Sequence, residues 1–151
     1  MSSNEVEVLL VEDNPQDADL ALRAFKKSKL ANSIYWVDDG EAALDFLFCR
    51  GAYADRASLR KPRVVLLDLK LPKIDGLEVL AAIKRDDRTR SIPVVIVTSS
   101  SQDPDVEKAY AMGANSYVVK PIDFDQFTDS MASLGYYWLL INEPPTREPA
   151  K

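Results

Sequence analysis

The stretch VVLLDLKLPKIDGLEVL at residues 64–80 decides the fold of this chain. It begins with the continuous apolar run 64–67, which is typical of a short strand buried on both faces of a parallel sheet. Asp68 ends this run, and Pro72 and Gly76 then predict a tight loop, in which glycine relieves backbone sterics. Apolar residues at helical spacing follow at 77–84. The stretch therefore predicts a buried strand, an acidic loop and a helix in succession.

The same alternation of strand and helix continues on both sides of this stretch. We expect strands at 6–11, 33–37, 64–67, 93–97 and 116–119, and helices from 15, at 41–48, at 77–84, at 106–112 and from 124 onward. Such alternation requires parallel strands that are joined by right-handed helical crossovers, with helices on both faces. The predicted fold is therefore α/β and flavodoxin-like, a doubly wound sheet of five parallel strands in the order 2-1-3-4-5 with five helices.

Length and composition indicate one folded domain. The 151 residues fit a single domain, and the hydrophobic share of 46% with 28% charged residues is ordinary for a globular protein. We expect this domain at residues 1–143, with its last helix extended by the apolar segment 136–141. Prolines at 144, 145 and 149 end regular structure, so we expect a disordered tail at 144–151.

Charge and residue usage exclude several classes of function. The net charge of -5 argues against a surface for nucleic acid or anionic lipid. No apolar stretch is long enough for a membrane span and no signal-type block follows the first residues, so we expect a cytoplasmic protein without membrane contact. The chain has no histidine and one cysteine, which excludes an internal disulfide and a Cys-rich zinc site. Any chemistry must use carboxylates, lysine or hydroxyl groups.

Acidic residues stand at the ends of the first and third expected strands. Glu12 and Asp13 follow the first strand, and Asp68 follows the third. In open parallel sheets, sites form beyond the carboxyl ends of the strands where the strand order reverses, which here is between these two strands. Three carboxylates held together require a shared proton or a cation, and an all-oxygen cluster suits Mg²⁺. The alternative is that these exposed acids only cap the helices that follow.

The fourth and fifth strands end in groups that complement these acids. Thr98 offers a hydroxyl donor and Lys120 an ammonium. Phosphoryl transfer requires mainly positioning and neutralisation of charge on the phosphoryl oxygens, which a metal ion, a lysine and a hydroxyl can supply. Asp68 would be the nucleophile, and since a carboxylate attacks while ionised, it needs no histidine base. The sequence therefore predicts a site at which Asp68 accepts a phosphoryl group.

Four motifs occur in a fixed order: VLLVEDNPQDADL at 8–20, VVLLDLKLPKIDGLEVL at 64–80, IPVVIVTSS at 92–100 and GANSYVVKPID at 113–123. Together they resemble the receiver domains of two-component response regulators over residues 6–135. The resemblance implies that Asp68 is the phosphoacceptor and that Mg²⁺ is held by Asp13 directly, by Glu12 through water, by Asp68 and by the backbone carbonyl of Lys70. It further implies that Thr98 and Lys120 hold the phosphoryl oxygens.

The family resemblance also implies how such a switch works. The phosphoryl donor would be a sensor histidine kinase, and Tyr117 would turn inward as Thr98 moves toward the phosphate. The bond from Lys120 to Pro121 would be cis. A receiver assists its own phosphorylation and dephosphorylation and is not otherwise an enzyme. Because only a short tail follows the last helix, we expect output through binding of another protein.

The long segment 50–62 and the aromatic tail 136–141 resemble, more narrowly, the stand-alone regulators of phytochrome-type histidine kinases. This resemblance implies a homodimer in which the extended last helix and its tail cover one another. The expected interface residues are Tyr117, Phe127, Tyr137, Trp138 and Ile141. The alternative is that Trp138 and its neighbours fold back on their own domain.

Three other functions compete with this interpretation. A phosphohydrolase with an aspartate nucleophile usually has a second aspartate two residues later, where this chain has Lys70. A flavin or nucleotide carrier needs a phosphate-binding loop after the first strand, and Glu12 and Asp13 would repel that phosphate. A degenerate receiver that only scaffolds a complex is disfavoured because every acceptor-site position carries a competent residue type.

Overall fold

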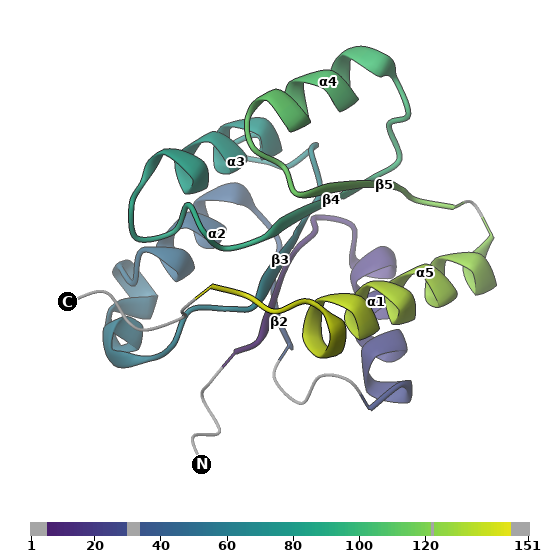
Figure 1. Ribbon diagram of the computed structural model, residues 1–151, viewed down its shortest axis with the longest axis horizontal. Coiled ribbons are helices and arrows are strands. Elements are labelled where there is room, and N and C mark those ends of the chain that lie inside the picture. The colour runs from purple at the N-terminus through teal and green to yellow at the C-terminus, as the bar shows by residue number, and fades with distance from the viewer. Residues whose placement is uncertain (1–5, 30–33, 122, 146–151) are drawn as a thin grey trace.

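The computed structural model describes residues 6–29, 34–121 and 123–145, which form a three-layer α/β domain (Figure 1). Its sheet has five strands: β1 (Val8–Val11), β2 (Ile34–Val37), β3 (Val64–Leu67), β4 (Val94–Thr98) and β5 (Ser116–Val119). All neighbouring strands are parallel, and their order is β2-β1-β3-β4-β5. The predicted flavodoxin-like sheet is confirmed.

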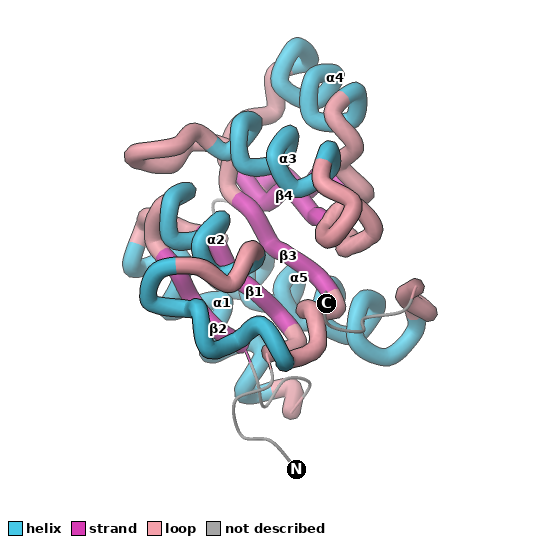
Figure 2. Tube along the Cα trace, turned by 90° about the vertical axis from the view of Figure 1, so that its left-hand side faces the viewer, coloured by secondary structure: helices cyan, strands magenta, loops and turns pink. Residues whose placement is uncertain are grey.

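Helices cover both faces of this sheet. They are α1 (Pro15–Lys27), α2 (Gly40–Leu47), α3 (Gly76–Arg85), α4 (Asp103–Ala111) and α5 (Phe124–Tyr136). Buried residues of α1 and α5 pack with one face of the sheet, and buried residues of α2, α3 and α4 pack with the other. Figure 2 shows β1 and β3 running through the middle of the molecule between these layers.

The position of each strand in the sheet explains its sequence. Every residue of β1, β3 and β4 is buried, because helices cover these inner strands on both faces, and their sequences are correspondingly apolar except for Thr98 at the end of β4. The edge strands β2 and β5 are partly exposed. The expected strand at 6–11 was too long at its amino end, since β1 begins at Val8. The expected strand at 33–37 agrees with β2 over Ile34–Val37, and residue 33 lies outside the described residues.

Side-chain caps fix where three helices begin at the carboxyl edge of the sheet. Asn14 Oδ1 accepts hydrogen bonds from the backbone N–H groups of Gln16 and Asp17 at 2.9 and 3.2 Å, and Pro15 opens α1. Asp39 caps α2 and Asp123 caps α5 in the same way. The cap of α1 fixes the loop that carries Glu12 and Asp13, whereas the loop after Asp68 leads to α3, whose first turn has no side-chain cap.

Lys84 joins the elements at the opposite, amino edge of β4 and β5. Its Nζ donates to the carbonyl oxygens of Arg90 and Ile92 at 3.1 and 2.8 Å, and to Asn115 Oδ1 at 3.0 Å. The same Asn115 oxygen accepts the N–H of Val94 at 2.9 Å. Burial lowers the pKa of Lys84. The side chain therefore ties α3 to the entry points of both strands.

The long segment before β3 is folded against the domain. It contains the 3-10 helix η1 (Gly51–Ser58), with a non-helical break at Tyr53. The rings of Tyr35 and Tyr53 each lie 5.2 Å from Phe46, and the hydroxyl groups of the two tyrosines lie 3.1 Å apart. The guanidinium of Arg56 lies 4.3 Å above the Phe46 ring. The segment therefore packs beside the edge strand β2.

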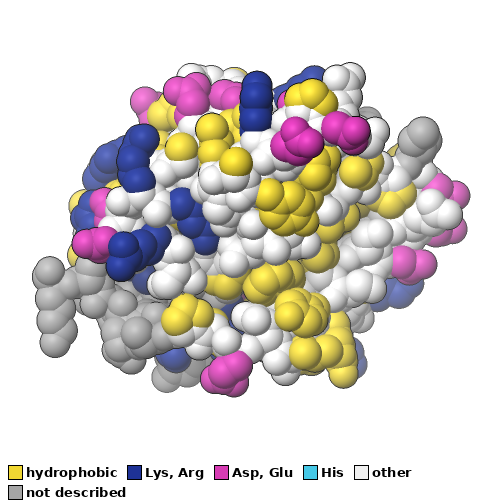
Figure 3. Space-filling view, turned by 45° about the horizontal axis from the view of Figure 1, so that its top comes forward, with side chains coloured by type: hydrophobic (Ala, Val, Ile, Leu, Met, Phe, Trp, Pro, Cys, Tyr) yellow, Lys and Arg dark blue, Asp and Glu magenta, His cyan; other side chains and the backbone are white. Residues whose placement is uncertain are grey.

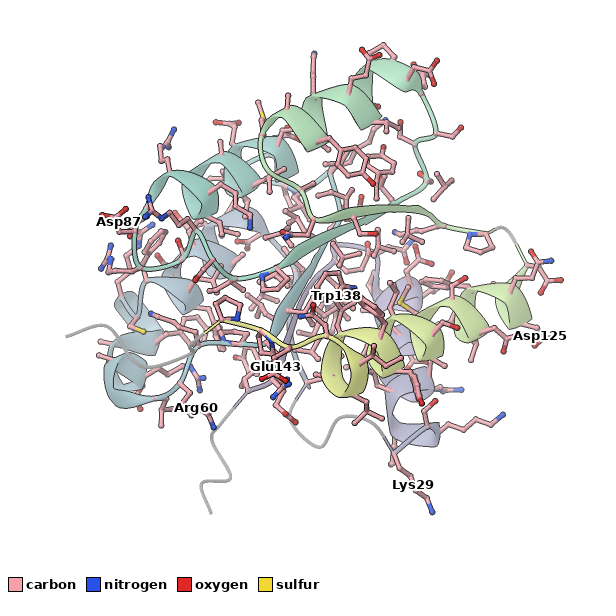
Figure 4. All side chains as sticks on the ribbon, in the orientation of Figure 1. Lys29, Arg60, Asp87, Asp125, Trp138 and Glu143 are labelled. Atoms are coloured by element: carbon pink, nitrogen blue, oxygen red, sulfur yellow. The ribbon has the colours of Figure 1, made fainter. Side chains whose placement is uncertain are left out.

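The aromatic tail forms one π-helical turn, η2 (Tyr137–Ile141), directly after α5. Trp138 and Leu139 are buried in the core on the α1 and α5 side, and Figure 4 shows Trp138 on the inner side of this turn. Tyr137, Leu140 and Ile141 are exposed. Trp138 and Leu139 therefore fold back on their own domain, which was the alternative to a dimer contact. The other side of the tail faces solvent.

The expected ends of the domain lie partly outside the described residues. This applies to residues 1–5 of the predicted domain and to 146–151 of the predicted disordered tail. Within residues 6–29, 34–121 and 123–145, no helix is both long and apolar enough to cross a membrane.

Candidate functional site

Three carboxylates meet at the carboxyl edge of the two central strands. β1 and β3 are paired so that Val11 lies opposite Leu67, and the next residues, Glu12 and Asp68, leave the strands side by side. Ligand oxygens of Glu12, Asp13 and Asp68 all lie within 4.8 Å of one another. Glu12 is 4% exposed and Asp68 7%, whereas Asp13 is exposed to solvent. The structure brings together the three acids that the sequence predicted.

Lys120 reaches this cluster from the end of β5. Its backbone N–H donates to the carbonyl oxygen of Thr98 at 2.7 Å, which joins the ends of β4 and β5. Its Nζ lies 2.7 Å from Glu12 Oε1, 2.9 Å from Asp68 Oδ2 and 2.9 Å from Asp17 Oδ2. Burial alone would lower the pKa of Lys120, but its hydrogen bonds to these carboxylates outweigh burial and raise it. Lys120 is therefore held as a cation.

The positive charge of Lys120 does not balance its surroundings. Burial raises the pKa of Glu12 to about 7; the hydrogen bond from Lys120 opposes this shift and the charge of Asp68 adds to it. One ammonium thus faces several carboxylates, and there is too little positive charge to balance them. The carboxylate that is least stabilised in its charged form is Glu12, the least exposed of the three converging acids. An all-oxygen donor set that lacks positive charge fits a hard divalent cation such as Mg²⁺.

The phosphoacceptor candidate Asp68 has one donor on each carboxylate oxygen. Lys120 Nζ donates to Oδ2 at 2.9 Å, and the backbone N–H of Lys70 donates to Oδ1 at 3.3 Å. Gly76 shapes the loop behind it, because a Cβ at that position would lie 2.3 Å from the carbonyl oxygen of Asp68. The expected tight loop is present, and it is the close approach of backbone that requires glycine at Gly76.

Thr98 ends β4 with a buried hydroxyl group. The residue is 1% exposed, and its Oγ1 has no hydrogen-bond partner within the described part of the chain. A buried hydroxyl without a partner is unfavourable, so such groups usually have a reason for persisting. Here the hydroxyl stands at the same edge of the sheet as Asp68 and is free to donate to a group that arrives there.

Tyr117 on β5 is tied to the loop that follows Thr98. Its hydroxyl donates to the carbonyl oxygen of Ser100 at 2.8 Å, and the Ser100 hydroxyl in turn donates to Asp105 of α4. Burial raises the pKa of Tyr117. The expectation of a cis bond between Lys120 and Pro121 was wrong: the bond is trans, the isomer that X–Pro bonds favour by about 0.5–1 kcal/mol.

The family model for the response regulator receiver domain matches residues 8–132. The chain belongs to the response regulator receiver domain family. This match spans every site residue described above, from Glu12 to Lys120, and it agrees with the sheet order and with the acidic cluster at its carboxyl edge.

Individual receiver proteins resemble the chain over most of its length. A probable methanogenesis regulatory protein, FilR2 of Methanothrix harundinacea, is 44% identical over 91% of this chain and 86% of its own. Response regulator Rcp1 of Synechocystis sp. is 36% identical over 87% of this chain and 88% of its own. The Mn²⁺-bound crystal structure of Rcp1 matches at a TM-score of 0.85, with 34% identity over 92% of this chain and 98% of that one.

A phosphorylated receiver is also similar to this receiver domain. The crystal structure of the phosphorylated cyanobacterial phytochrome response regulator RcpA matches at a TM-score of 0.87, with 34% identity. The match covers 94% of this chain and 99% of RcpA. The chain is therefore similar, over nearly its full length, to stand-alone response regulators of phytochromes.

Two residues of the receiver site were missed in the sequence. Asp17 stands in the first turn of α1 and binds Lys120; the available signal was its place as the acidic residue in the first turn of the helix that begins beside the end of β1. Trp36 on the edge strand β2 donates its Nε1–H to the carbonyl oxygen of Glu12 at 2.7 Å. No sequence signal joins Trp36 to Glu12, since the contact depends on the pairing of β2 with β1.

The expected dimer-interface residues do not share one surface in the receiver domain. Phe127 is 4% exposed and Trp138 9%, because both pack into the core on the α1 and α5 side. We therefore correct the assignment of these two residues to an interface. Tyr117 is half-buried, whereas Tyr137 and Ile141 are exposed. Figure 3 shows hydrophobic side chains gathered in patches on the side of the molecule that carries α4 and α5.

Proposed function

We propose that this receiver domain is a phosphorylation switch that accepts a phosphoryl group on Asp68. The observation that carries the proposal is the convergence on Asp68 of an ammonium, a backbone N–H and a cluster of acidic ligands. At the same edge of the sheet is the buried hydroxyl of Thr98, which has no partner among the described residues. These groups are complementary to a dianionic phosphoryl group with a divalent cation. The similarity to phosphorylated RcpA supports the same conclusion.

The transfer itself requires little covalent chemistry from the protein. An oxygen of Asp68 attacks phosphorus, the bond from phosphorus to the donor breaks, and the donor leaves with the bonding electron pair. Because Asp68 attacks as a carboxylate, no proton has to be removed from it, which suits a chain without histidine. Lys120 and Thr98 then donate hydrogen bonds to the phosphoryl oxygens. The ammonium of Lys120 also neutralises part of the negative charge on these oxygens.

Glu12, Asp13, Asp68 and the backbone carbonyl of Lys70 would hold Mg²⁺. The oxygens of the three carboxylates converge, while the role of the Lys70 carbonyl is carried over from the family. The cation would supply positive charge to the phosphoryl oxygens. The Mn²⁺-bound form of Rcp1 supports a divalent metal at this kind of site.

The switch would be read on α4, β5 and α5. We propose that Thr98 moves toward the phosphoryl group and that the loop after β4 follows, which releases the hydrogen bond from Tyr117 to Ser100 and lets the tyrosine ring turn inward. A protein partner would recognise the altered surface.

The protein acts on its own aspartyl phosphate, whose formation and hydrolysis it assists. We assign it no separate substrate and no nucleic acid.

We propose that the phosphoryl donor is a sensor histidine kinase of the phytochrome type, which acts in the cytoplasm. The likeness to RcpA and Rcp1 supports this donor. The name of FilR2 supports a kinase that responds to another signal as the second candidate. Phosphotransfer from a purified phytochrome kinase and from an unrelated kinase distinguishes the two, because the cognate kinase transfers faster. Equal initial rates would refute the phytochrome assignment.

We also propose that the exposed side of the tail forms a homodimer. Tyr137, Leu140 and Ile141 are 46%, 62% and 58% exposed on one turn, and such an apolar patch favours a symmetric contact. Replacement of Leu140 and Ile141 by serine should yield a monomer in analytical ultracentrifugation. The variant keeps the core residue Trp138, so the packing of the tail on its own domain is not changed. A dimer that persists in this variant would refute the interface.

The test of the phosphoacceptor is intact mass after incubation with Mg²⁺ and acetyl phosphate. The wild type should gain one phosphate, and Asp68→Asn should gain none. Asp38→Asn is the matched control, because Asp38 also follows a strand but is exposed at the end of β2. A wild type that neither gains phosphate nor binds beryllofluoride would refute the function and favour a scaffold.

A further inference from the structure

The ammonium of Lys120 has a third carboxylate partner that the proposed phosphoryl chemistry does not use. Lys120 Nζ lies 2.9 Å from Asp17 Oδ2, as close as it lies to Asp68 and nearly as close as to Glu12. A lysine ammonium has three N–H donors, so each carboxylate can take one of them. Asp17 comes from the first turn of α1, whereas the other two acids stand at strand ends.

Asp17 stands apart from the acids that could hold a cation. Within the described residues, that acidic group consists of Glu12, Asp13 and Asp68. Glu12 and Asp68 are therefore both candidate ligands of the cation and hydrogen-bond partners of Lys120, while Asp17 is a partner of Lys120 alone. When Asp68 carries a phosphoryl group and Glu12 turns toward a cation, Asp17 is the carboxylate that remains available to Lys120.

The contact between Asp17 and Lys120 is both fixed and shielded. The backbone N–H of Asp17 donates to Asn14 Oδ1, so the helix cap sets where the side chain begins. The Asp17 side chain is 27% exposed and that of Lys120 10%. A charge-assisted hydrogen bond with little access to water is stronger than one at the surface. Asp17 can therefore orient the ammonium group and not merely lie near it.

We propose that Asp17 is a positioning residue for Lys120, which holds one N–H of the ammonium on α1 so that the others point at the phosphoryl group on Asp68. This inference rests on the proposed phosphoacceptor function. It implies that α1 takes part in the chemistry through Asp17, a residue of the first motif to which the family resemblance assigned no role. The opposing hypothesis, which the test below distinguishes, is competition: Asp17 would hold Lys120 away from the phosphoryl group and slow the reaction.

Two substitutions at Asp17 separate positioning from charge. Asp17→Asn keeps an acceptor oxygen without the charge, and Asp17→Ala removes both. The rate of phosphorylation by acetyl phosphate with Mg²⁺ should fall about tenfold in Asp17→Ala, within the roughly 100-fold range that misplacement of reacting groups can cause, and only about twofold in Asp17→Asn. Equal effects of the two variants, or a faster reaction in either, would overturn positioning in favour of charge or competition.

Asp19 offers a matched control on the same helix. Its carboxylate pairs with Arg23 at 2.9 Å and its side chain is 56% exposed. Within the described residues, it makes no hydrogen bond or ion pair with Lys120 or with the acids of the site. Asp19→Asn and Asp19→Ala should leave the phosphorylation rate unchanged. Urea unfolding of all four variants checks that a slower reaction does not reflect loss of folded protein.

A second readout needs neither phosphate nor kinase. In the metal-free wild type, the three hydrogen bonds of Lys120 should slow exchange of its ammonium protons, which NMR of the side-chain ¹⁵Nζ detects. Asp17→Ala should accelerate this exchange and Asp17→Asn should not; an unchanged Lys120 signal in Asp17→Ala would overturn the inference. If the signal responds as expected but the wild type accepts no phosphate, the phosphoacceptor function fails while the contact itself is established.

Discussion

Glu12→Gln should remove most of the pH dependence of folding stability in the metal-free protein. Burial raises the pKa of Glu12 from its ordinary value of 4.5 to about 7, against the hydrogen bond from Lys120. Because this pKa is higher in the folded protein than in the unfolded chain, the folded state binds the proton more tightly. Stability should therefore fall as pH rises from about 4.5 to about 7.

The size of this effect follows from the pKa of Glu12. Each pH unit between the unfolded and folded pKa values corresponds to about 1.4 kcal/mol, so the interval corresponds to about 3 kcal/mol. Glu12 is 4% exposed, so solvent screens the effect little. The loss is large beside the about 5–15 kcal/mol that stabilises a typical domain. Since the chain has no histidine, the range from pH 5 to 8 is free of the side chain that usually titrates there.

The assay is urea unfolding at pH 5 and pH 8 in the presence of a chelator, followed by tryptophan fluorescence. The wild type should be less stable at pH 8 than at pH 5 by about 2.5 kcal/mol, because part of the loss has already occurred at pH 5. The free energy of unfolding of Glu12→Gln should be nearly equal at the two pH values. Glu78→Gln, at an exposed position of α3, is the control and should keep the wild-type dependence. Excess Mg²⁺ at pH 8 should stabilise the wild type. Equal stability of the wild type at both pH values, or the same slope in Glu12→Gln, would refute the argument.

Three further predictions concern the site and the tail. Thr98→Val removes a buried hydroxyl without a described partner, so it should raise the free energy of unfolding by about 1 kcal/mol while weakening beryllofluoride binding; a loss of stability would show that the hydroxyl is satisfied. Gly76→Ala should destabilise by about 1–3 kcal/mol and slow phosphorylation, because its Cβ would press on backbone; unchanged unfolding would contradict this. Trp138→Ala should cost about 3–5 kcal/mol in urea unfolding, and a cost below about 1 kcal/mol would show that the tail does not pack on its own domain.

The sequence was sufficient for the sheet and for the strand-end residues of the site. Strands covered on both faces are continuous apolar runs, so β1, β3 and the first four residues of β4 could be recognised directly. Once the strands are parallel and their order is known, Glu12 and Asp68 must leave the sheet side by side. The positions of these residues follow from topology, which alternation of strand and helix already specifies.

Other features depend on packing that the sequence does not encode locally. The segment 136–141 is apolar on every side, so periodicity could not tell which side would be buried, and Trp138 turned inward while Tyr137 remained exposed. The resemblance to phytochrome-type regulators assigned Phe127 to an interface, whereas it packs in the core with α1, which lies far away in sequence. The contact of Asp17 with Lys120 depends on the direction of one side chain across the gap between α1 and β5. The trans bond before Pro121 has no signal in the sequence.

The clamp formed by Lys84 has a mechanical consequence for signalling. It fixes the carbonyl groups of Arg90 and Ile92 and the side chain of Asn115, so β4 and β5 are held together where they enter the sheet. Thr98 is the last residue of β4, at the end away from Lys84, and the loop that follows it leads to α4. With the amino ends of both strands fastened, a displacement of Thr98 would be taken up at the carboxyl end of β4 and in this loop. The entry points that Lys84 holds would stay in place.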